Sequence, residues 1–126
     1  MICLVGCQDS SSESELTVEQ YNNILQRSNL LDADSTTVLV RELQFPAGWT
    51  APKHHHSGEL FIYVIKGEFE VTMEGSDPVV YSTGDALEMR AGANMHARNP
   101  SQTNSLKLVA FQVGNPDAPF VIPVPE

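Results

Sequence analysis

The four histidines of the sequence fall in two places: His54, His55 and His56 are consecutive, and His96 stands alone. In an extended strand, residues i and i+2 point to the same face, so His54 and His56 can project together while His55 points away. Two neutral imidazoles on one face are good ligands for a divalent transition metal such as Fe, Mn, Ni, Cu or Zn. A third imidazole from a neighbouring strand would complete the set and leave positions open for substrate. Clustered histidines also occur in solvated loops, so the histidines alone leave both interpretations open.

The segments that would position these histidines are short, β-branched or alternating, and separated by turns with glycine or proline. Strands of this length, with such a turn roughly every 8–12 residues, are typical of an all-β sandwich or barrel. The expected strands are 36–45, 60–65, 69–74, 78–81, 86–89, 106–113 and 120–122. We expect two sheets to close over a core of Leu60, Ile62, Val64, Val71, Leu87, Leu108 and Ala110.

The N-terminal part of the chain has a different pattern. Residues 8–15 are rich in Ser, Glu and Asp and predict a disordered linker. Residues 17–20 have the form of a helix capping box, and the pattern continues at helical spacing with Val18, Tyr21, Ile24 and Leu25. A short helix or arm is therefore expected from 17 to about 27. The expected organisation is a flexible tail over 1–15, a helix or arm within 16–34, and a barrel domain over 35–126.

The string Leu4-Val5-Gly6-Cys7 resembles the bacterial lipobox, in which a small residue precedes a cysteine that becomes lipidated. A signal peptide needs a basic start and an apolar run of roughly 7–15 residues. Only six residues precede Cys7, and none of them is basic. Two alternatives follow. Either the true start lies upstream and Cys7 anchors a periplasmic or membrane-attached lipoprotein, or the match is chance and the protein is cytoplasmic.

Composition and charge exclude several classes of function. The chain has 126 residues, a size typical of one domain, and a formal net charge of −9 from 16 acidic and 7 basic residues. The basic residues are scattered, whereas a nucleic-acid binder needs a positive surface, so nucleic acid is not expected as a partner. The two cysteines, Cys3 and Cys7, lie outside the expected core and support no disulfide framework. No apolar run approaches the roughly 20 residues of a membrane span.

Two longer motifs surround the histidines. The first is Gly48-x5-His54-x-His56, followed by Glu59 and then Gly67. It resembles the first motif of the cupin superfamily, which is G-x5-H-x-H-x3,4-E-x6-G. The resemblance implies that Glu59 joins the two histidines as a metal ligand.

The second motif runs from Gly84 through Gly92 to His96 and Asn99. It resembles the second cupin motif, G-x5-P-x-G-x2-H-x3-N, which implies that His96 is the third histidine ligand. Together the motifs cover about residues 35–126. They imply a small single-domain cupin with the double-stranded β-helix fold, also called a jelly-roll barrel, whose histidine site opens into the barrel.

The sequence departs from the family pattern at the acidic ligand. An ungapped alignment places Leu60 at the glutamate position, and Glu59 is one residue early. In a regular strand Glu59 would face away from the histidines, but a bulge at Ser57–Gly58 could turn it inward.

The second motif departs in two ways. Arg90 replaces its proline, and the expected histidine position falls on Met95, with His96 one residue late. A slip of one residue moves a side chain to the other face of a sheet. We expect the turn at 92–94 to be one residue longer, so that His96 still points inward.

Two functions from different classes follow from these features. The first is a metal-dependent, dioxygenase-like oxidoreductase acting on a small organic molecule, with His54, His56 and His96 holding the metal and with catalytic residues unassigned. The alternative is a non-catalytic cupin module that binds a small molecule. A homodimer is also expected, because residues 36–45 form a plausible edge strand that a second copy could pair with.

Overall fold

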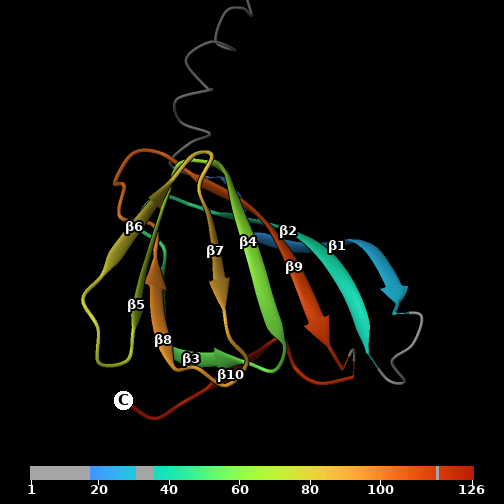
Figure 1. The fold of residues 1–126 in the computed structure, drawn as a ribbon. Coiled ribbons are helices and arrows are strands. Elements are labelled where there is room, and N and C mark those ends of the chain that lie inside the picture. Colours follow the sequence, from blue (N-terminus) through green and yellow to red (C-terminus); the bar gives the residue numbers. More distant parts are fainter. Residues whose placement is uncertain (1–17, 31–35, 116) are drawn as a thin grey trace, which may run out of the picture.

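The computed structural model describes residues 18–30, 36–115 and 117–126, and Figure 1 shows two facing sheets without a helix in this part of the chain. The first sheet has the order β1-β2-β9-β4-β7, and the second has the order β10-β3-β8-β5-β6. All the strand pairs are antiparallel. The strands are β1 (Tyr21–Asn29), β2 (Thr37–Phe45), β3 (Thr50–His56), β4 (Glu59–Lys66), β5 (Glu68–Met73), β6 (Val79–Ser82), β7 (Ala86–Met89), β8 (Met95–Arg98), β9 (Leu106–Gly114) and β10 (Val121–Pro123). The predicted all-β architecture is confirmed.

The core lies between the two sheets, and strict alternation along the strands builds it. On β4, Leu60 and Val64 are almost fully buried, while Phe61 and Tyr63 on the other face are about half exposed. This is the period of two that directs one face of a strand to the core. Every predicted core residue lies in the core except Leu87, which is only partly buried and packs against it.

Two of the places where the chain passes from one sheet to the other are tight. Residues 57–58 connect β3 to β4, and a Cβ atom on Gly58 would lie 2.7 Å from the Val113 carbonyl oxygen. Gly67 connects β4 to β5 with a φ of 92°, and a Cβ atom there would lie 2.5 Å from the Ser105 carbonyl oxygen. Only glycine combines this close approach with a positive φ at low cost.

The N-terminal segment was expected to form a helix or an arm, and the helix is wrong, because the segment forms strand β1. It pairs with β2 from Tyr21 opposite Gln44 to Asn29 opposite Thr37, with a bulge between Ile24 and Gln26. The helical spacing was a weak local signal, and eight cross-strand residue pairs override it.

The new strand also changes the expected sheet edge. Strand β2 lies between β1 and β9, so its edge is already paired, and β1 is the edge strand on that side of the sheet. Homodimerisation through an edge strand stays a prediction, with β1 as the candidate. The predicted tail over 1–15, including Cys3 and Cys7, lies outside the described residues.

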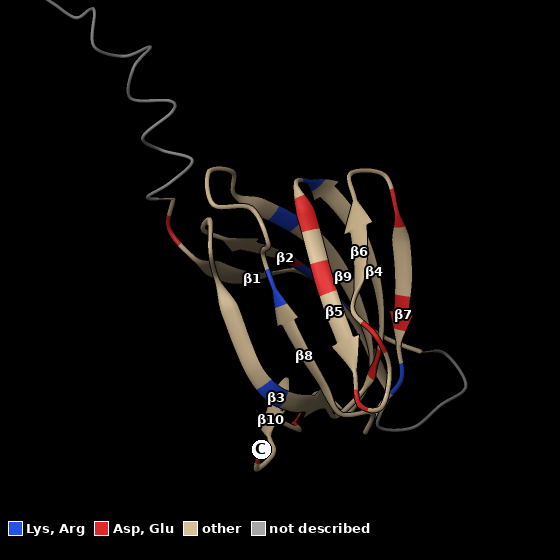
Figure 2. Cartoon of the chain, turned by 90° about the vertical axis from the view of Figure 1, so that its left-hand side faces the viewer, with Lys and Arg blue, Asp and Glu red and all other residues tan. Residues whose placement is uncertain are grey.

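Figure 2 shows how the charged positions are distributed over the strands, with acidic positions prominent on β5 and β7 and basic positions on separate strands. The predicted absence of a basic cluster agrees with this distribution. Within the described ranges, no helix is long and apolar enough to cross a membrane.

Candidate functional site

A cavity of about 180 Å³ lies inside the barrel. Its walls are almost entirely apolar and come from both sheets, with Phe45, Leu60, Phe69 and Leu108 among them. The polar residues that line it are Gln20, Asn22, His54 and His56. The two histidines therefore meet the same apolar space, as their spacing predicted.

A β-bulge in β3 sets the direction of these histidines. Ala51 pairs with Ala97 and His54 pairs with Met95, which leaves the two residues 52–53 opposite a single residue of β8. In a regular strand, positions three apart would face opposite ways, but here both Ala51 and His54 line the cavity. A proline is tolerated at position 52 because a bulge does not need every backbone N–H for the ladder.

The two inward imidazoles are buried, with exposures of 6% for His54 and 5% for His56, and their ring centroids are 5.0 Å apart in an edge-on arrangement. Backbone carbonyls hold both rings. The Nδ1–H of His54 donates to the Pro52 oxygen at 2.7 Å, and the Nδ1–H of His56 donates to the Phe120 oxygen at 2.8 Å. In this tautomer the lone pair of each neutral ring is on Nε2. Each ring thus keeps one nitrogen for a guest in the cavity.

The electrostatics of the site favour neutral imidazole. Burial is the main cause that lowers the pKa of His56 from 6.5 to about 4. The hydrogen bond to Phe120 opposes this shift, while the charges of His54, His55 and Arg41 add to it. At pH 7 His56 is therefore a neutral ring that can accept a hydrogen bond or bind a metal.

The expected inward turn of His96 is not found. On β8, Met95 is 1% exposed and faces the core opposite His54, whereas the His96 side chain is 49% exposed on the outer face. The apolar residues Met95 and Ala97 fix this register, because turning His96 inward would bring both of them to the surface. The predicted longer turn is thus corrected: the inward position belongs to the Met95 thioether.

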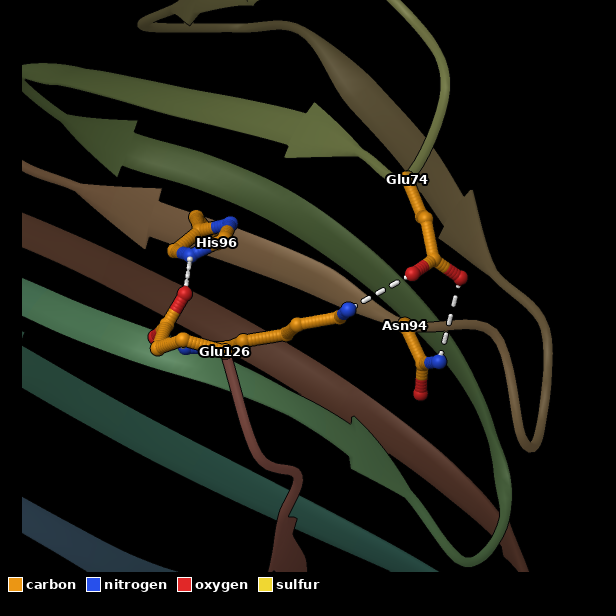
Figure 3. A network of polar contacts seen from close by, with 5 residues as sticks. Glu74, Asn94, His96 and Glu126 are labelled. Carbon is orange, nitrogen blue, oxygen red and sulfur yellow. Dashed lines mark hydrogen bonds and ion pairs between the residues drawn. The ribbon is translucent and has the colours of Figure 1, made fainter.

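On the outer face, His96 belongs to a surface network. Figure 3 shows His96 and Glu126 facing each other, with Nε2 and Oε1 3.0 Å apart. The Lys53 N–H and then His96 lower the pKa of the Glu126 carboxyl. The neighbouring Glu74 carboxylate binds Lys53 Nζ at 2.6 Å and Asn94 Nδ2 at 3.2 Å.

Glu59 also lies away from the inward histidines. Its carboxylate accepts a hydrogen bond from the Ala91 backbone N–H and lies 3.9 Å from an Arg90 nitrogen. Its neighbour Leu60 takes the inward position of β4 and lines the cavity. The bulge proposed at 57–58 to turn Glu59 inward is not found, because the bulge of β3 lies five residues earlier, at 52–53.

Of the four predicted metal ligands, only the imidazoles of His54 and His56 line the cavity. Among the residues that the structure describes, no three His, Cys, Asp or Glu side chains lie close enough to hold one metal ion. Catalytic metal sites usually have three protein ligands. The donor set present does not fit a complete metal centre of that type.

Sequence reasoning missed three residues around the cavity. Gln20 and Asn22 line it, but both fell in the segment predicted as a helix or arm. Arg41 lies on the inward side of β2 between Leu39 and Leu43, which are both buried. The alternation of β2 carried this signal, because Arg41 has the same parity as these two leucines.

Comparison with known families and structures agrees with this architecture. The family model described as the cupin domain matches residues 41–111. No curated protein sequence matches the chain.

Solved structures give the same result for the fold. The DMSP lyase DddQ from Ruegeria pomeroyi DSS-3 is similar with a TM-score of 0.67 and 22% identity, over 90% of this chain and 56% of the lyase. An RmlC-like cupin family protein from Methanocaldococcus jannaschii has a TM-score of 0.59 and 20% identity, over 79% of this chain and 94% of that protein.

A variant of the salicylate 1,2-dioxygenase from Pseudoaminobacter salicylatoxidans has a TM-score of 0.54 and 25% identity, over 60% of this chain and 22% of the dioxygenase. The chain thus spans little more than half of the lyase and less than a quarter of the dioxygenase. Together the neighbours confirm the predicted double-stranded β-helix.

Proposed function

Because the chain belongs to the cupin family, whose members bind small-molecule substrates, we propose that it is a small-molecule-binding module. The observation that carries this proposal is the apolar cavity of about 180 Å³ with His54 and His56 in its wall. An apolar cavity of about 150 Å³ in another protein holds benzene. A guest of about the size of a six-membered ring therefore suits the space.

The chemistry of the wall favours a guest that is apolar with one polar group. Burial of apolar surface contributes roughly 25 cal/mol for each Å² removed from water. The Nε2 lone pairs of His54 and His56 can accept a hydrogen bond from a hydroxyl or amine. Because backbone carbonyls already orient both rings, little ordering is needed when the guest binds.

The single tryptophan of the chain provides the test. Trp49 lines the cavity and stacks on Phe45 with 3.8 Å between ring centroids. We expect cyclohexanol, which does not absorb near 280 nm, to change the Trp49 fluorescence saturably. Ala51→Leu narrows the cavity and should weaken binding, whereas Ala86→Leu on the exposed part of β7 should not. A non-saturable response, or equal binding by Ala51→Leu, would contradict the proposal.

A metal-dependent, dioxygenase-like oxidoreductase is the second candidate. The support for this candidate is the pair of histidines. Backbone carbonyls accept hydrogen bonds from their Nδ1–H groups, and histidines that bind metals are often oriented in this way. Since the described residues supply two imidazoles, the other ligands of a divalent metal would come from water or from the guest.

Metal content after reconstitution with Fe(II), Mn(II), Ni(II), Cu(II) or Zn(II) tests this second candidate. Bound metal should be lost in His54→Ala and in His56→Ala. It should be retained in His55→Ala and in His96→Ala, because neither ring lines the cavity. Retention of metal by His54→Ala and His56→Ala would exclude this site as the metal centre.

We also propose that Cys7 carries a lipid anchor that holds the domain at a membrane outside the cytoplasm. The support is the lipobox-like string that ends at Cys7. When the protein is expressed from its natural gene with the upstream DNA, it should incorporate an alkyne-labelled fatty acid. Cys7→Ser should abolish the label and Cys3→Ser should keep it, whereas no label in the wild type would contradict the lipid anchor.

A further inference from the structure

Arg41 is a cation on the inner side of the barrel wall. It lies on β2 between the buried Leu39 and Leu43, and its side chain shares their side of the sheet. Its Nε donates to Gln112 Oε1 at 2.8 Å, and one terminal nitrogen donates to Asn22 Oδ1 at 3.1 Å. These contacts fix the guanidinium at the inner face between β1 and β9.

The guanidinium lies beside the cavity, next to Asn22, which is an exposed residue of the cavity lining. Its central carbon is 4.3 Å from the centroid of the Phe120 ring, and that ring is 4.8 Å from the ring of His56. Phe120 and Asn22, the two side chains that contact Arg41 on this side, both line the cavity. A guest beside His56 would therefore have Arg41 as its nearest cationic neighbour on β2.

The charge of Arg41 is poorly compensated. Its hydrogen-bond partners are the neutral amides of Gln112 and Asn22, and no carboxylate in the described ranges forms an ion pair with it. This is unusual in a chain with 16 acidic and 7 basic residues. Burial lowers the pKa of Arg41, which shows that the surroundings disfavour its charge. An anion beside it would offset that cost.

The donors of Arg41 match a planar anion. A guanidinium carries five N–H groups in a fork, and the two contacts above use only two of them. The remaining donors can bind a carboxylate through two parallel hydrogen bonds, which are among the stronger polar contacts in proteins.

We propose that the cavity takes small organic acids, with the apolar body of the ligand inside the barrel and its carboxylate on Arg41. This inference rests on the proposed binding function and specifies its ligand class. His54 and His56 contact the body of the ligand, Phe120 packs between the imidazole and the guanidinium, and Arg41 selects the anion. The ligand class is that of a ring of about six carbon atoms bearing one carboxylate.

A matched pair of ligands tests the proposal through Trp49 fluorescence. Cyclohexanecarboxylate and cyclohexanol share the ring and differ in charge. At pH 7.5 and low ionic strength, the wild type should bind the acid at least tenfold more tightly than the alcohol. In Arg41→Gln this preference should disappear, and alcohol affinity should stay within about twofold of that of the wild type. Arg90→Gln, which changes an exposed arginine on the outer face, should keep the preference.

A salt titration of the wild type gives a second measurement that does not depend on folding of the variant. Affinity for the acid should fall as NaCl rises from 20 to 500 mM, because salt screens the ion pair, while affinity for the alcohol should not. Equal binding of the two ligands, or an unchanged preference in folded Arg41→Gln, would overturn the inference and leave the binding function standing. Binding of neither ligand would overturn the binding function itself.

Discussion

The two histidine positions of this barrel lie on neighbouring strands of one sheet and have opposite environments. His54 and His56 on β3 are buried beside the cavity, and backbone carbonyls accept hydrogen bonds from their Nδ1–H groups. His96 on β8 is exposed, and its Nε2 is engaged by the carboxylate of Glu126. The same residue type thus supplies lone pairs to a cavity on one strand and a surface hydrogen bond on the next.

Register accounts for this difference. In β3, the bulge at 52–53 keeps Ala51 and His54 on the inner face although they are three residues apart. In β8, regular alternation keeps Met95 and Ala97 inside and therefore places His96 outside. A one-residue change of register moves a histidine between a binding site and the solvent, so counting ligands in a motif does not establish that they converge.

The largest expected effect comes from the inner face of β8. Met95→Ala should lower the free energy of unfolding by about 2–5 kcal/mol, because it removes a side chain that is 1% exposed and leaves a void in the core. Urea unfolding followed by circular dichroism measures this loss. If His96→Ala cost as much stability as Met95→Ala, the assignment of the two faces of β8 would be wrong.

The next effect concerns His56 and pH. Its pKa in the folded protein is about 4, below 6.5, so the unfolded chain binds more protons between these values. The corresponding stability is fully present above pH 6.5 and is lost as the pH falls towards 4. Between pH 7.5 and 4.5, the wild type should lose about 2–3 kcal/mol more than His56→Gln does. Equal losses in urea titrations of both proteins would show that His56 titrates normally in the fold.

A gain of function sharpens the same comparison. Met95→His places an imidazole at the inward position of β8, directly opposite His54. Directly opposite residues have Cβ atoms roughly 4.5–5.5 Å apart, within the span of two ligands of one ion. We expect Met95→His to bind Co(II) at least tenfold more tightly than the wild type, measured by absorbance titration of the folded protein. An affinity equal to that of the wild type would show that this position does not reach the histidine pair.

Most of the fold could be predicted from the sequence, because period-two alternation and glycine turns act locally. The strands around Leu60, Val71 and Leu108 follow from this pattern, and so does the shared face of His54 and His56. The N-terminal segment was mispredicted because Val18, Ile24 and Leu25 fit a helix as well as a strand. Only pairing with β2, which is distant in sequence, decides between the two.

The site could be predicted only in part, for a related reason. Local pattern identified the histidine pair, but the direction of His96 depends on which register of β8 buries more apolar surface. Met95 and Ala97 decide that outcome against His96. The bulge at 52–53 depends on cross-strand pairing and leaves no local mark except Pro52. Arg41 was overlooked because its role depends on Phe120 and Asn22, which come from other parts of the chain.

The smallest expected effect is on the outer face of β8. His96→Ala removes an exposed ring whose partner, Glu126, is more exposed still, and such surface pairs contribute little to stability. Glu126 keeps its hydrogen bond from the Lys53 N–H, and β10 still pairs with β3, so the C-terminal segment stays attached to β3 without His96. The midpoint of thermal unfolding should therefore stay within experimental error, and Trp49 should report unchanged affinity for cyclohexanol. A loss of ligand affinity in His96→Ala with unchanged stability would mean that His96 acts on the cavity, and the separation between the two histidine positions would no longer hold.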